Sequence, residues 1–138
     1  MQFYAVRDIK AGEQLFYSYC RPTNLAQRKA ELAPYDFICQ CPACLNATPE
    51  TDELRDTFTS RIAPLKSLIE NASFDEATLT EAIKLEKEMV KEGLDVEFEF
   101  VTLLTAICLM CGKLGRLEES EKYGVLVESF NNCFKSDE

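Results

Sequence analysis

The sequence predicts a mainly α protein with a small β part, divided into two domains. From residue 48 to the end of the chain, apolar residues recur at steps of three and four, which is the period of an amphipathic helix. Residues 1–45 instead contain two short β-rich segments, one short helical segment and a loop with three closely spaced cysteines. We therefore expect a first domain of residues 1–45 and an α-helical domain of residues 46–138.

Two strands are predicted near the start of the chain, at residues 3–6 and 14–20. A turn joins them, in which Gly12 can adopt a positive φ without strain. Side chains alternate between the two faces of a strand, so Tyr19 and Cys20 are expected on opposite faces.

A short helix over residues 25–33 follows, with Asn24 as its N-cap and Pro34 preventing its continuation. Residues 35–44 then form a cysteine-rich loop. The next helix begins after Thr48, with Pro49 at its first position, and we expect Pro64 to kink or split it. Its inward face is the series Leu54, Phe58, Ile62, Leu65 and Ile69.

Three further boundaries are predicted from capping residues. Ser73 and Glu76 form a capping-box pair that opens a helix with Leu79, Ile83 and Val90 on one side, and Gly93 closes it. Asp95 opens a mostly buried helix that ends near residue 114, and a last amphipathic helix covers residues 117–134.

The segment of residues 111–123 is similar to the crossing between the two helices of a tetratricopeptide unit. Small residues at such a crossing allow the helix axes to approach closely. No second copy occurs at the expected spacing. We therefore expect tetratricopeptide-like antiparallel packing in residues 46–138, not an array of repeats.

The net charge of −9 is unevenly distributed, with +1 on residues 1–45 and −10 on residues 46–138. Binding of nucleic acid requires clustered Lys and Arg, so we expect no direct nucleic-acid binding by the helical half. A basic protein or peptide is the better electrostatic match, and the simpler alternative is a solvated acidic surface. No apolar run is long enough to span a membrane and no signal-peptide pattern is present, so we expect a nuclear or cytoplasmic location without membrane contact.

Three thiols lie within six positions, at Cys39, Cys41 and Cys44. They cannot all pair with one another as disulfides, but as thiolates they can converge on one zinc ion. Structural zinc is four-coordinate, so a fourth ligand is needed. Cys20 is one candidate and a water molecule is another, while three inert buried thiols are the alternative to any metal site. Cys108, Cys111 and Cys133 are expected in the helical core instead.

Four short motifs lie in order along residues 5–39 and together carry a family resemblance. They are Ala5-Val6-Arg7-Asp8-Ile9, Gly12-Glu13-Gln14-Leu15, Ser18-Tyr19 and Tyr35-Asp36-Phe37-Ile38-Cys39. With the cysteine loop, they resemble the closing segment of SET-domain protein-lysine methyltransferases. The closest likeness is to the SET and MYND-like branch, in which post-SET cysteines lead straight into a helical C-terminal domain. The resemblance implies that residues 1–45 are a remnant of a SET β-fold with its post-SET loop.

The resemblance also implies roles for three aromatic residues. Tyr19 would be catalytic, its hydroxyl orienting the lysine amine and the methyl group of S-adenosyl-L-methionine. Tyr35 would help to wall the substrate lysine channel, and Phe37 would stack on the adenine of the cofactor. The substrate would be a lysine in a histone or another protein. Taken singly, the aromatic residues are better explained as part of a strand face or core, and only their combination favours the enzyme.

Two elements of that family are not found in the sequence: the N-terminal strands with their glycine-rich cofactor loop, and the Asn-His-x-Cys segment that supplies the fourth zinc ligand. We therefore expect the 138 residues alone, as a fragment or a degenerate paralogue, to bind S-adenosyl-L-methionine poorly and to transfer little methyl. The alternative function is a non-catalytic adaptor, in which a zinc-stapled loop braces a helical domain that binds a basic peptide or protein.

Overall fold

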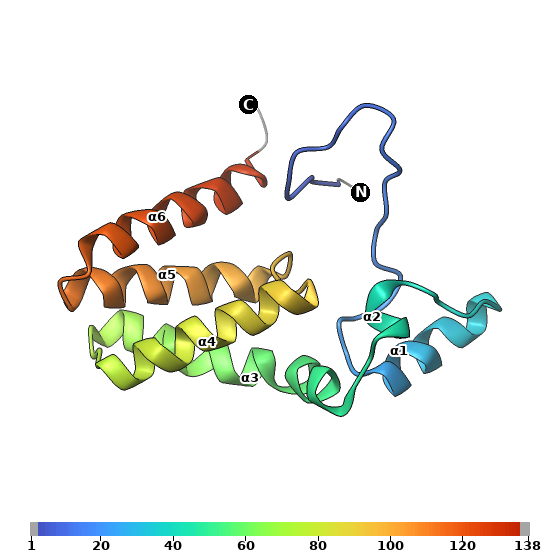
Figure 1. The fold of residues 1–138 in the computed structure, drawn as a ribbon, viewed down its shortest axis with the longest axis horizontal. Helices are drawn as coiled ribbons and strands as arrows, with labels where there is room; N and C mark the ends of the chain where they lie inside the picture. Colours follow the sequence, from blue (N-terminus) through green and yellow to red (C-terminus); the bar gives the residue numbers. More distant parts are fainter. Residues whose placement is uncertain (1–2, 136–138) are drawn as a thin grey trace.

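The structure is a computed structural model, and it describes residues 3–135. In Figure 1 the long helices lie side by side, with shorter helices and an irregular N-terminal segment beside them. The mainly α class is confirmed. The elements in chain order are α1 (Leu25–Leu32), η1 (Ala33–Tyr35), α2 (Pro42–Leu45), α3 (Pro49–Asn71), α4 (Glu76–Glu92), α5 (Phe98–Lys113) and α6 (Leu117–Asn132).

The predicted β part is wrong in form, since residues 3–135 contain no strand. Residues 3–20 run as an irregular segment, although the predicted turn between them is present. In that turn the Glu13 N–H donates to the Lys10 carbonyl at 3.1 Å, and Gly12 has a φ of +82°. A strand is stable only when a neighbouring strand pairs with its N–H and C=O groups. Because no such pairing forms here, β propensity alone does not produce a strand.

Helix starts follow the predicted caps where the capping residue lies directly before the helix. The Asn24 side chain accepts from the Gln27 N–H at the start of α1, and Thr48 caps α3 with Pro49 at its first position. The start of α4 is different from the prediction, because Asp75 is the N-cap and accepts from the Thr78 N–H at 2.7 Å.

The end of α4 also displaces the start of α5. Gly93, with a φ of +75°, lets Leu94 turn back so that its N–H donates to the Met89 carbonyl at 2.8 Å. Leu94 is buried in this turn, and the chain needs three more residues before α5 begins at Phe98. The predicted opening at Asp95 is therefore three residues too early.

Helix α3 runs without interruption through Pro64, so the predicted split is wrong. Pro64 lies on the exposed face of the helix, as does Ser60, the residue whose carbonyl loses its partner because proline has no N–H. Water can satisfy a carbonyl on that face, which explains why the helix continues.

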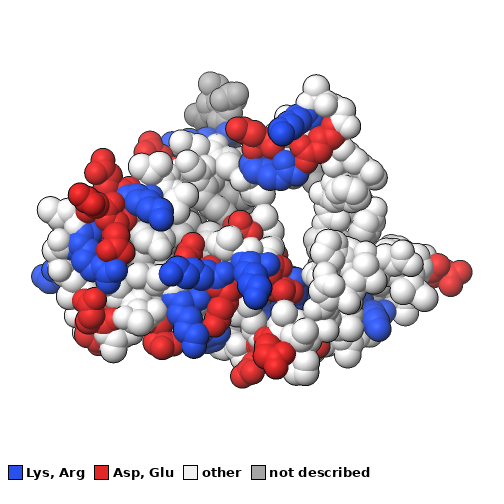
Figure 2. All heavy atoms as spheres, viewed as in Figure 1, with Lys and Arg blue, Asp and Glu red and all other residues white. Residues whose placement is uncertain are grey.

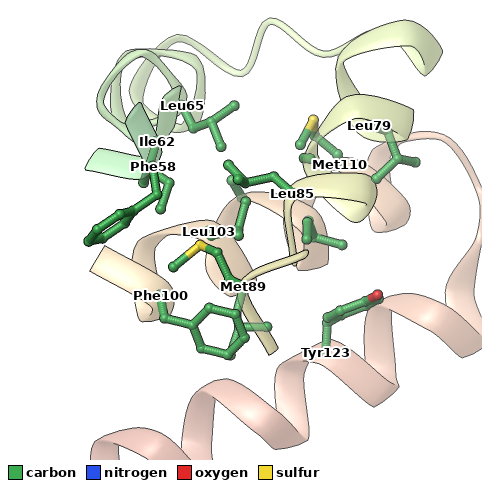
Figure 3. Packing of buried hydrophobic residues seen from close by; sticks show 14 of the residues in the cluster. Phe58, Ile62, Leu65, Leu79, Leu85, Met89, Phe100, Leu103, Met110 and Tyr123 are labelled. Atoms are coloured by element: carbon green, nitrogen blue, oxygen red, sulfur yellow. The ribbon is translucent and has the colours of Figure 1, made fainter. Parts of the chain in front are cut away.

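The hydrophobic core lies between α3, α4, α5 and α6 (Figure 3). Helix α5 contributes the largest share of it, as its apolar sequence predicts. Four predicted core residues of α3 are buried, but Val90 of α4 is 47% exposed while its neighbour Met89 is fully buried. Cys111 is buried as predicted, Cys108 packs against the core, and Cys133 lies at the end of α6 outside the core cluster. The largest fully buried side chains are Ile62, Leu79, Met89, Leu94, Leu103, Ile107, Met110 and Cys111.

Helices α5 and α6 approach closely where small residues meet. A Cβ atom built on Gly112 would lie 3.1 Å from the Ser120 Oγ, and one on Gly124 would lie 3.6 Å from the Cys108 Sγ. The Ser120 hydroxyl donates to the Cys108 carbonyl at 2.9 Å. The crossing is therefore closed by a polar contact as well as by small size. None of the described helices combines the length and apolar character needed to cross a bilayer.

Two polar contacts fix α1 against the first turns of α3. The Asn24 side-chain amide donates to both carboxylate oxygens of Asp56 at 3.0 and 3.1 Å, and the Leu25 backbone N–H donates to Asp52 at 2.8 Å. Asp52 thus satisfies an N–H at the start of α1 that has no partner within that helix. These contacts set the position of the cysteine loop relative to the helical core.

Candidate metal and cofactor site

The three clustered cysteines lie on the loop that enters α2. Cys41 is the N-cap of this short helix and Pro42 occupies its first position, where a missing N–H costs nothing. The Cys44 and Leu45 N–H groups both donate to the Cys41 carbonyl at 3.0 Å. This tight turn brings the Cys44 side chain back towards Cys41.

The Sγ atoms of Cys39, Cys41 and Cys44 all lie within 4.8 Å of one another. Zinc binds thiolate sulfur at about 2.3 Å, so tetrahedral ligands lie about 3.8 Å apart. The donor set is therefore of the right kind and close to the right separation for one zinc ion. Cys20, the predicted possible fourth ligand, is not part of this group within the described residues.

The thiols differ in how their surroundings affect ionisation. Burial by itself raises the pKa of Cys41, but hydrogen bonds from the Cys44 backbone and from the other two thiols outweigh it, so its pKa is lowered. The pKa of Cys39 is raised: a backbone hydrogen bond from Cys41 lowers it, but burial and the neighbouring thiols act more strongly together. One thiol of the cluster is thus prepared to ionise first, as metal binding requires.

The three predicted aromatic site residues lie together. The ring centroid of Tyr19 lies 6.4 Å from that of Tyr35 and 6.1 Å from that of Phe37. The Tyr19 and Phe37 rings meet edge to face. The Tyr17 ring lies closer still, tilted and with its centroid 4.5 Å from that of Tyr19, and the side-chain interaction with Tyr19 raises the pKa of Tyr17. All four rings are exposed, so their contacts form an open aromatic surface and not a closed core.

A hollow of about 540 Å³ joins this aromatic surface to the cysteine loop. Phe37 lies in its wall, next to Ile38 and to two of the clustered cysteines. This volume falls within the range typical of small-molecule sites, which are mainly apolar with few polar groups. Its lining residues are Lys29, Leu32, Ala33, Asp36, Phe37, Ile38, Cys39 and Cys44.

A larger hollow, of about 1040 Å³, lies along α3 and α4 near the end of α2. It is lined mostly by polar and charged side chains of both signs, among them Arg61, Lys84 and Glu88. It contains none of the predicted site residues, so its size does not make it the better candidate. Figure 2 shows basic and acidic side chains interspersed over the helices on this face, although residues 46–138 carry a net charge of −10.

Sequence reasoning missed Arg28, the buried residue that ties this region together. Its guanidinium donates to the Thr23 carbonyl on one side and to the Ala43 carbonyl, at 3.1 Å, on the other. It is only 4% exposed. The signal was its spacing, since Leu25 and Leu32 lie three residues before and four after it, on the inward face of α1.

Two curated proteins are similar to this chain. The SET domain and MYND-type zinc finger protein 6 of Schizosaccharomyces pombe is 40% identical over 75 residues, which are 51% of this chain and 15% of that protein. The histone-lysine N-methyltransferase SET5 of Meyerozyma guilliermondii is 44% identical over 52 residues, which are 36% of this chain and 11% of that protein. The chain thus spans less than a sixth of the length of these relatives.

No protein-family model and no solved structure matches the chain. The two relatives nevertheless confirm the predicted resemblance to the closing portion of SET-domain proteins, one of which is named as a histone-lysine methyltransferase. Neither comparison tests the individual roles of Tyr19, Tyr35 or Phe37, and the tetratricopeptide-like packing also stays a prediction.

Proposed function

We propose that this chain is the closing part of an S-adenosyl-L-methionine-dependent protein-lysine methyltransferase of the SET and MYND-like branch, and that it carries a structural zinc ion. One observation carries the proposal. The ring centroids of Tyr35 and Phe37 lie within 6.4 Å of the Tyr19 ring centroid, beside three thiols whose sulfur atoms lie within 4.8 Å of one another. The similarity to a histone-lysine N-methyltransferase supports the same reaction class. The substrate would be a histone or other protein lysine in the nucleus or cytoplasm.

The chemistry requires a neutral lysine amine aligned with an electrophilic methyl group. S-adenosyl-L-methionine supplies that methyl on a sulfonium. When bound, the cofactor would supply this methyl to the amine nitrogen, and the methylated amine would release a proton to solvent. The Tyr19 hydroxyl would orient the amine for this line of attack, and the Tyr35 ring would hold the approaching ammonium before it is deprotonated.

Phe37 would supply a stacking surface for adenine. It is 44% exposed and lines the hollow of about 540 Å³, so one ring face is available to a planar ligand. Zinc at Cys39, Cys41 and Cys44 would hold the loop directly after Phe37. Its contribution is structural: it limits the conformations of a segment that has little core of its own.

The decisive test is methyl transfer by the protein that carries this segment, expressed in full. We expect Tyr19→Phe to lower kcat about a hundredfold or more, because it removes a positioned hydroxyl, while binding of S-adenosyl-L-methionine measured by calorimetry stays within about twofold. Tyr123→Phe is the matched control, since it removes a hydroxyl from the helical core far from the site. Unchanged turnover in Tyr19→Phe would exclude the proposed role of this residue.

Calorimetry also separates the enzyme from a zinc-stapled adaptor. We expect Phe37→Ala to weaken S-adenosyl-L-methionine binding by the full protein about tenfold, whereas Phe16→Ala, which truncates a ring that is 82% exposed, should have no effect. The 138 residues alone are expected to bind the cofactor weakly. Absence of any binding by the full protein would favour the adaptor.

A further inference from the structure

We propose that Asp36 is a positioning residue of the candidate site. Its left-handed backbone turns the chain between Tyr35 and Phe37, so that both of their rings meet the ring of Tyr19. The roles of the three rings rest on the proposed function, but their geometry is a property of the chain without any ligand. The backbone conformation of Asp36, and not its carboxylate, sets that geometry.

Asp36 has an uncommon backbone conformation. It caps η1 with a φ of 54° and a ψ of 41°, and its N–H donates to the Ala33 carbonyl at 3.2 Å. Among residues 3–135, Ala72 is the other non-glycine residue with a positive φ. In this conformation Cβ crowds the following carbonyl oxygen, so L-residues rarely adopt it, although aspartate and asparagine do so more readily than most. Such a conformation persists where the surrounding structure requires it.

The left-handed residue changes the direction of the chain. It ends the helical turn of η1, as left-handed residues commonly do at helix ends. The next residues, 37–39, then run back beside α1, because they line the hollow of about 540 Å³ together with Lys29 and Leu32 of that helix. A right-handed conformation at Asp36 would instead continue the turn and carry residues 37–39 away from α1.

The same turn decides how two aromatic rings lie. Side chains two positions apart on a right-handed turn do not face each other, so Tyr35 and Phe37 would then point to different sides. In the structure both lie against one ring, with centroids 6.4 Å and 6.1 Å from that of Tyr19. Only Asp36 separates them in the chain. Its φ is therefore the backbone angle on which the shared contact with Tyr19 depends.

The Asp36 carboxylate does not explain the conformation. The side chain is exposed, and within the part of the chain that the structure describes it makes no hydrogen bond or ion pair. Substitutions at this position should therefore rank by their tolerance of a positive φ. Glycine adopts it without strain, asparagine adopts it readily, and the β-branched valine does so least.

The first experiment measures the ring contact in the 138-residue chain, without cofactor or metal. Nuclear Overhauser effects between the ring protons of Tyr19 and Phe37 report it directly. Asp36→Val should lose most of this signal, whereas Asp36→Gly and Asp36→Asn should retain it. The Leu25 amide, which donates to Asp52 at 2.8 Å, shows whether α1 stays in place, and its resonance should not shift in any of these variants.

Ala72→Val is the matched control. Ala72 caps α3 with a φ of 49°, at the end of that helix opposite α2, so valine meets the same backbone strain outside the site. This variant should lower the urea midpoint of the helical core and keep the ring contact. Asp36→Val should do the reverse, because the core of residues 54–123 does not include position 36.

Two results in the 138-residue chain would overturn the positioning role. Loss of the ring contact in Asp36→Gly or Asp36→Asn would show that the carboxylate is responsible, and not the backbone. A shift of the Leu25 amide in Asp36→Val, together with loss of the ring contact, would show that Asp36 stabilises the whole segment around α1 and has no specific effect on the rings.

Cofactor binding by the full protein is the second readout. We expect Asp36→Val to weaken S-adenosyl-L-methionine binding about tenfold in calorimetry, Asp36→Gly to restore it to within about twofold, and Ala72→Val to leave it unchanged. Loss of the ring contact in Asp36→Val, with no cofactor binding by the full protein, would uphold the positioning of the rings and contradict the proposed function. Equal ring contacts in Asp36→Val and the unmodified chain would overturn the role of Asp36 and leave the proposed function standing.

Discussion

Arg28 is the residue on which the geometry of the candidate site most depends. It connects α1 to the carbonyls of Thr23 and Ala43, which belong to the two segments that α1 separates in sequence. A buried arginine is retained only when its donors find acceptors, because an isolated buried charge is strongly unfavourable. The two hydrogen bonds of Arg28 therefore hold the segment before α1 and the cysteine loop together.

We predict that Arg28→Met lowers the free energy of unfolding by about 2–4 kcal/mol, since it keeps much of the aliphatic volume but leaves two carbonyls without donors. Lys29→Met is the matched control, because Lys29 is a neighbouring exposed cation with no such role. Urea unfolding followed by circular dichroism measures both. Equal losses in the two variants would contradict the structural role of Arg28.

Glu97 is a second single residue that should affect stability, in this case the dependence of the free energy of unfolding on pH. Burial and the neighbouring Glu99 raise the pKa of Glu97, while Arg55 opposes them. With a raised pKa in the folded state, the folded chain binds more protons than the unfolded chain. Glu97 therefore stabilises the fold below its pKa in the unfolded state. This contribution is lost as the pH rises through its higher pKa in the folded state.

Glu97→Gln is accordingly expected to be more stable than the unmodified chain at pH 7, and the difference should disappear near pH 4, below the ordinary glutamate pKa of about 4.3. Glu128→Gln, an exposed position on α6, controls for the change in net charge. Urea midpoints measured at the two pH values provide the test. A difference that grows towards pH 4 would show that the sign is wrong.

The contact between α5 and α6 shows how a single element pair depends on side-chain size. Alanine favours a helix over glycine by about 1 kcal/mol. At Gly124 the added Cβ would make an ordinary contact 3.6 Å from Cys108, but at Gly112 it would lie 3.1 Å from a Ser120 hydroxyl already bonded to the Cys108 carbonyl. The two glycines should therefore respond oppositely.

We predict that Gly124→Ala stabilises the protein by about 0.5–1 kcal/mol, whereas Gly112→Ala destabilises it by about 1 kcal/mol through loss of the Ser120 hydrogen bond. In a Ser120→Ala background the clash is removed, so Gly112→Ala should become stabilising. Thermal unfolding of the four variants forms a double-mutant cycle. An additive cycle would indicate that Gly112 and Ser120 do not interact.

Residues at the ends of the helices explain which elements the sequence could predict. The start of α1 at Asn24, the start of α3 at Thr48 and the end of α4 at Gly93 depend on residues next to the helix end, and all three were predicted correctly. The strands at residues 3–6 and 14–20 failed because pairing partners are not a local property. Helix α3 continues through Pro64 because that residue faces solvent. The prediction from sequence did not take this exposure into account.

For the candidate site, the residue spacing predicted which side chains lie together, but it did not predict the backbone conformation around them. Tyr19 meets Tyr35 and Phe37 although no strand forms around it, and the three cysteines converge because Pro42 starts a helix after Cys41. Arg28 was not predicted, since a single charged residue on a short helix is normally solvated. Only its tertiary contacts reveal that it faces inward.

At the scale of the whole molecule, the hydrophobic core of the described residues 3–135 does not extend to the candidate site. The core cluster runs from Leu54 to Tyr123, whereas residues 3–45 contain only two buried side chains, Leu32 and Arg28. An opening separates much of the N-terminal segment from the helices in Figure 2. Residues 3–45 are thus held by the contacts of α1 with Asp52 and Asp56, by the ring contact between Tyr4 and Phe134 and, in our proposal, by zinc.

Removal of zinc should therefore loosen one part of the molecule only. We predict that a chelator abolishes the protection of backbone amides in α2 and in the loop before it, because closed thiolate ligation replaces a hydrophobic core there. Amides of α3 to α6 should keep their protection, since their core of residues 54–123 includes none of the metal-binding thiols.

Hydrogen exchange read by mass spectrometry distinguishes this outcome peptide by peptide, with and without chelator. Asp52→Ala is the informative companion variant, because it removes the side chain that accepts from the Leu25 N–H. It should loosen α1 while the zinc-loaded α2 keeps its protection, and the chelator should then release both. If the chelator instead opened α3 to α6 in the same transition, the two domains would be one cooperative unit, and the helical half would depend on the metal for its stability.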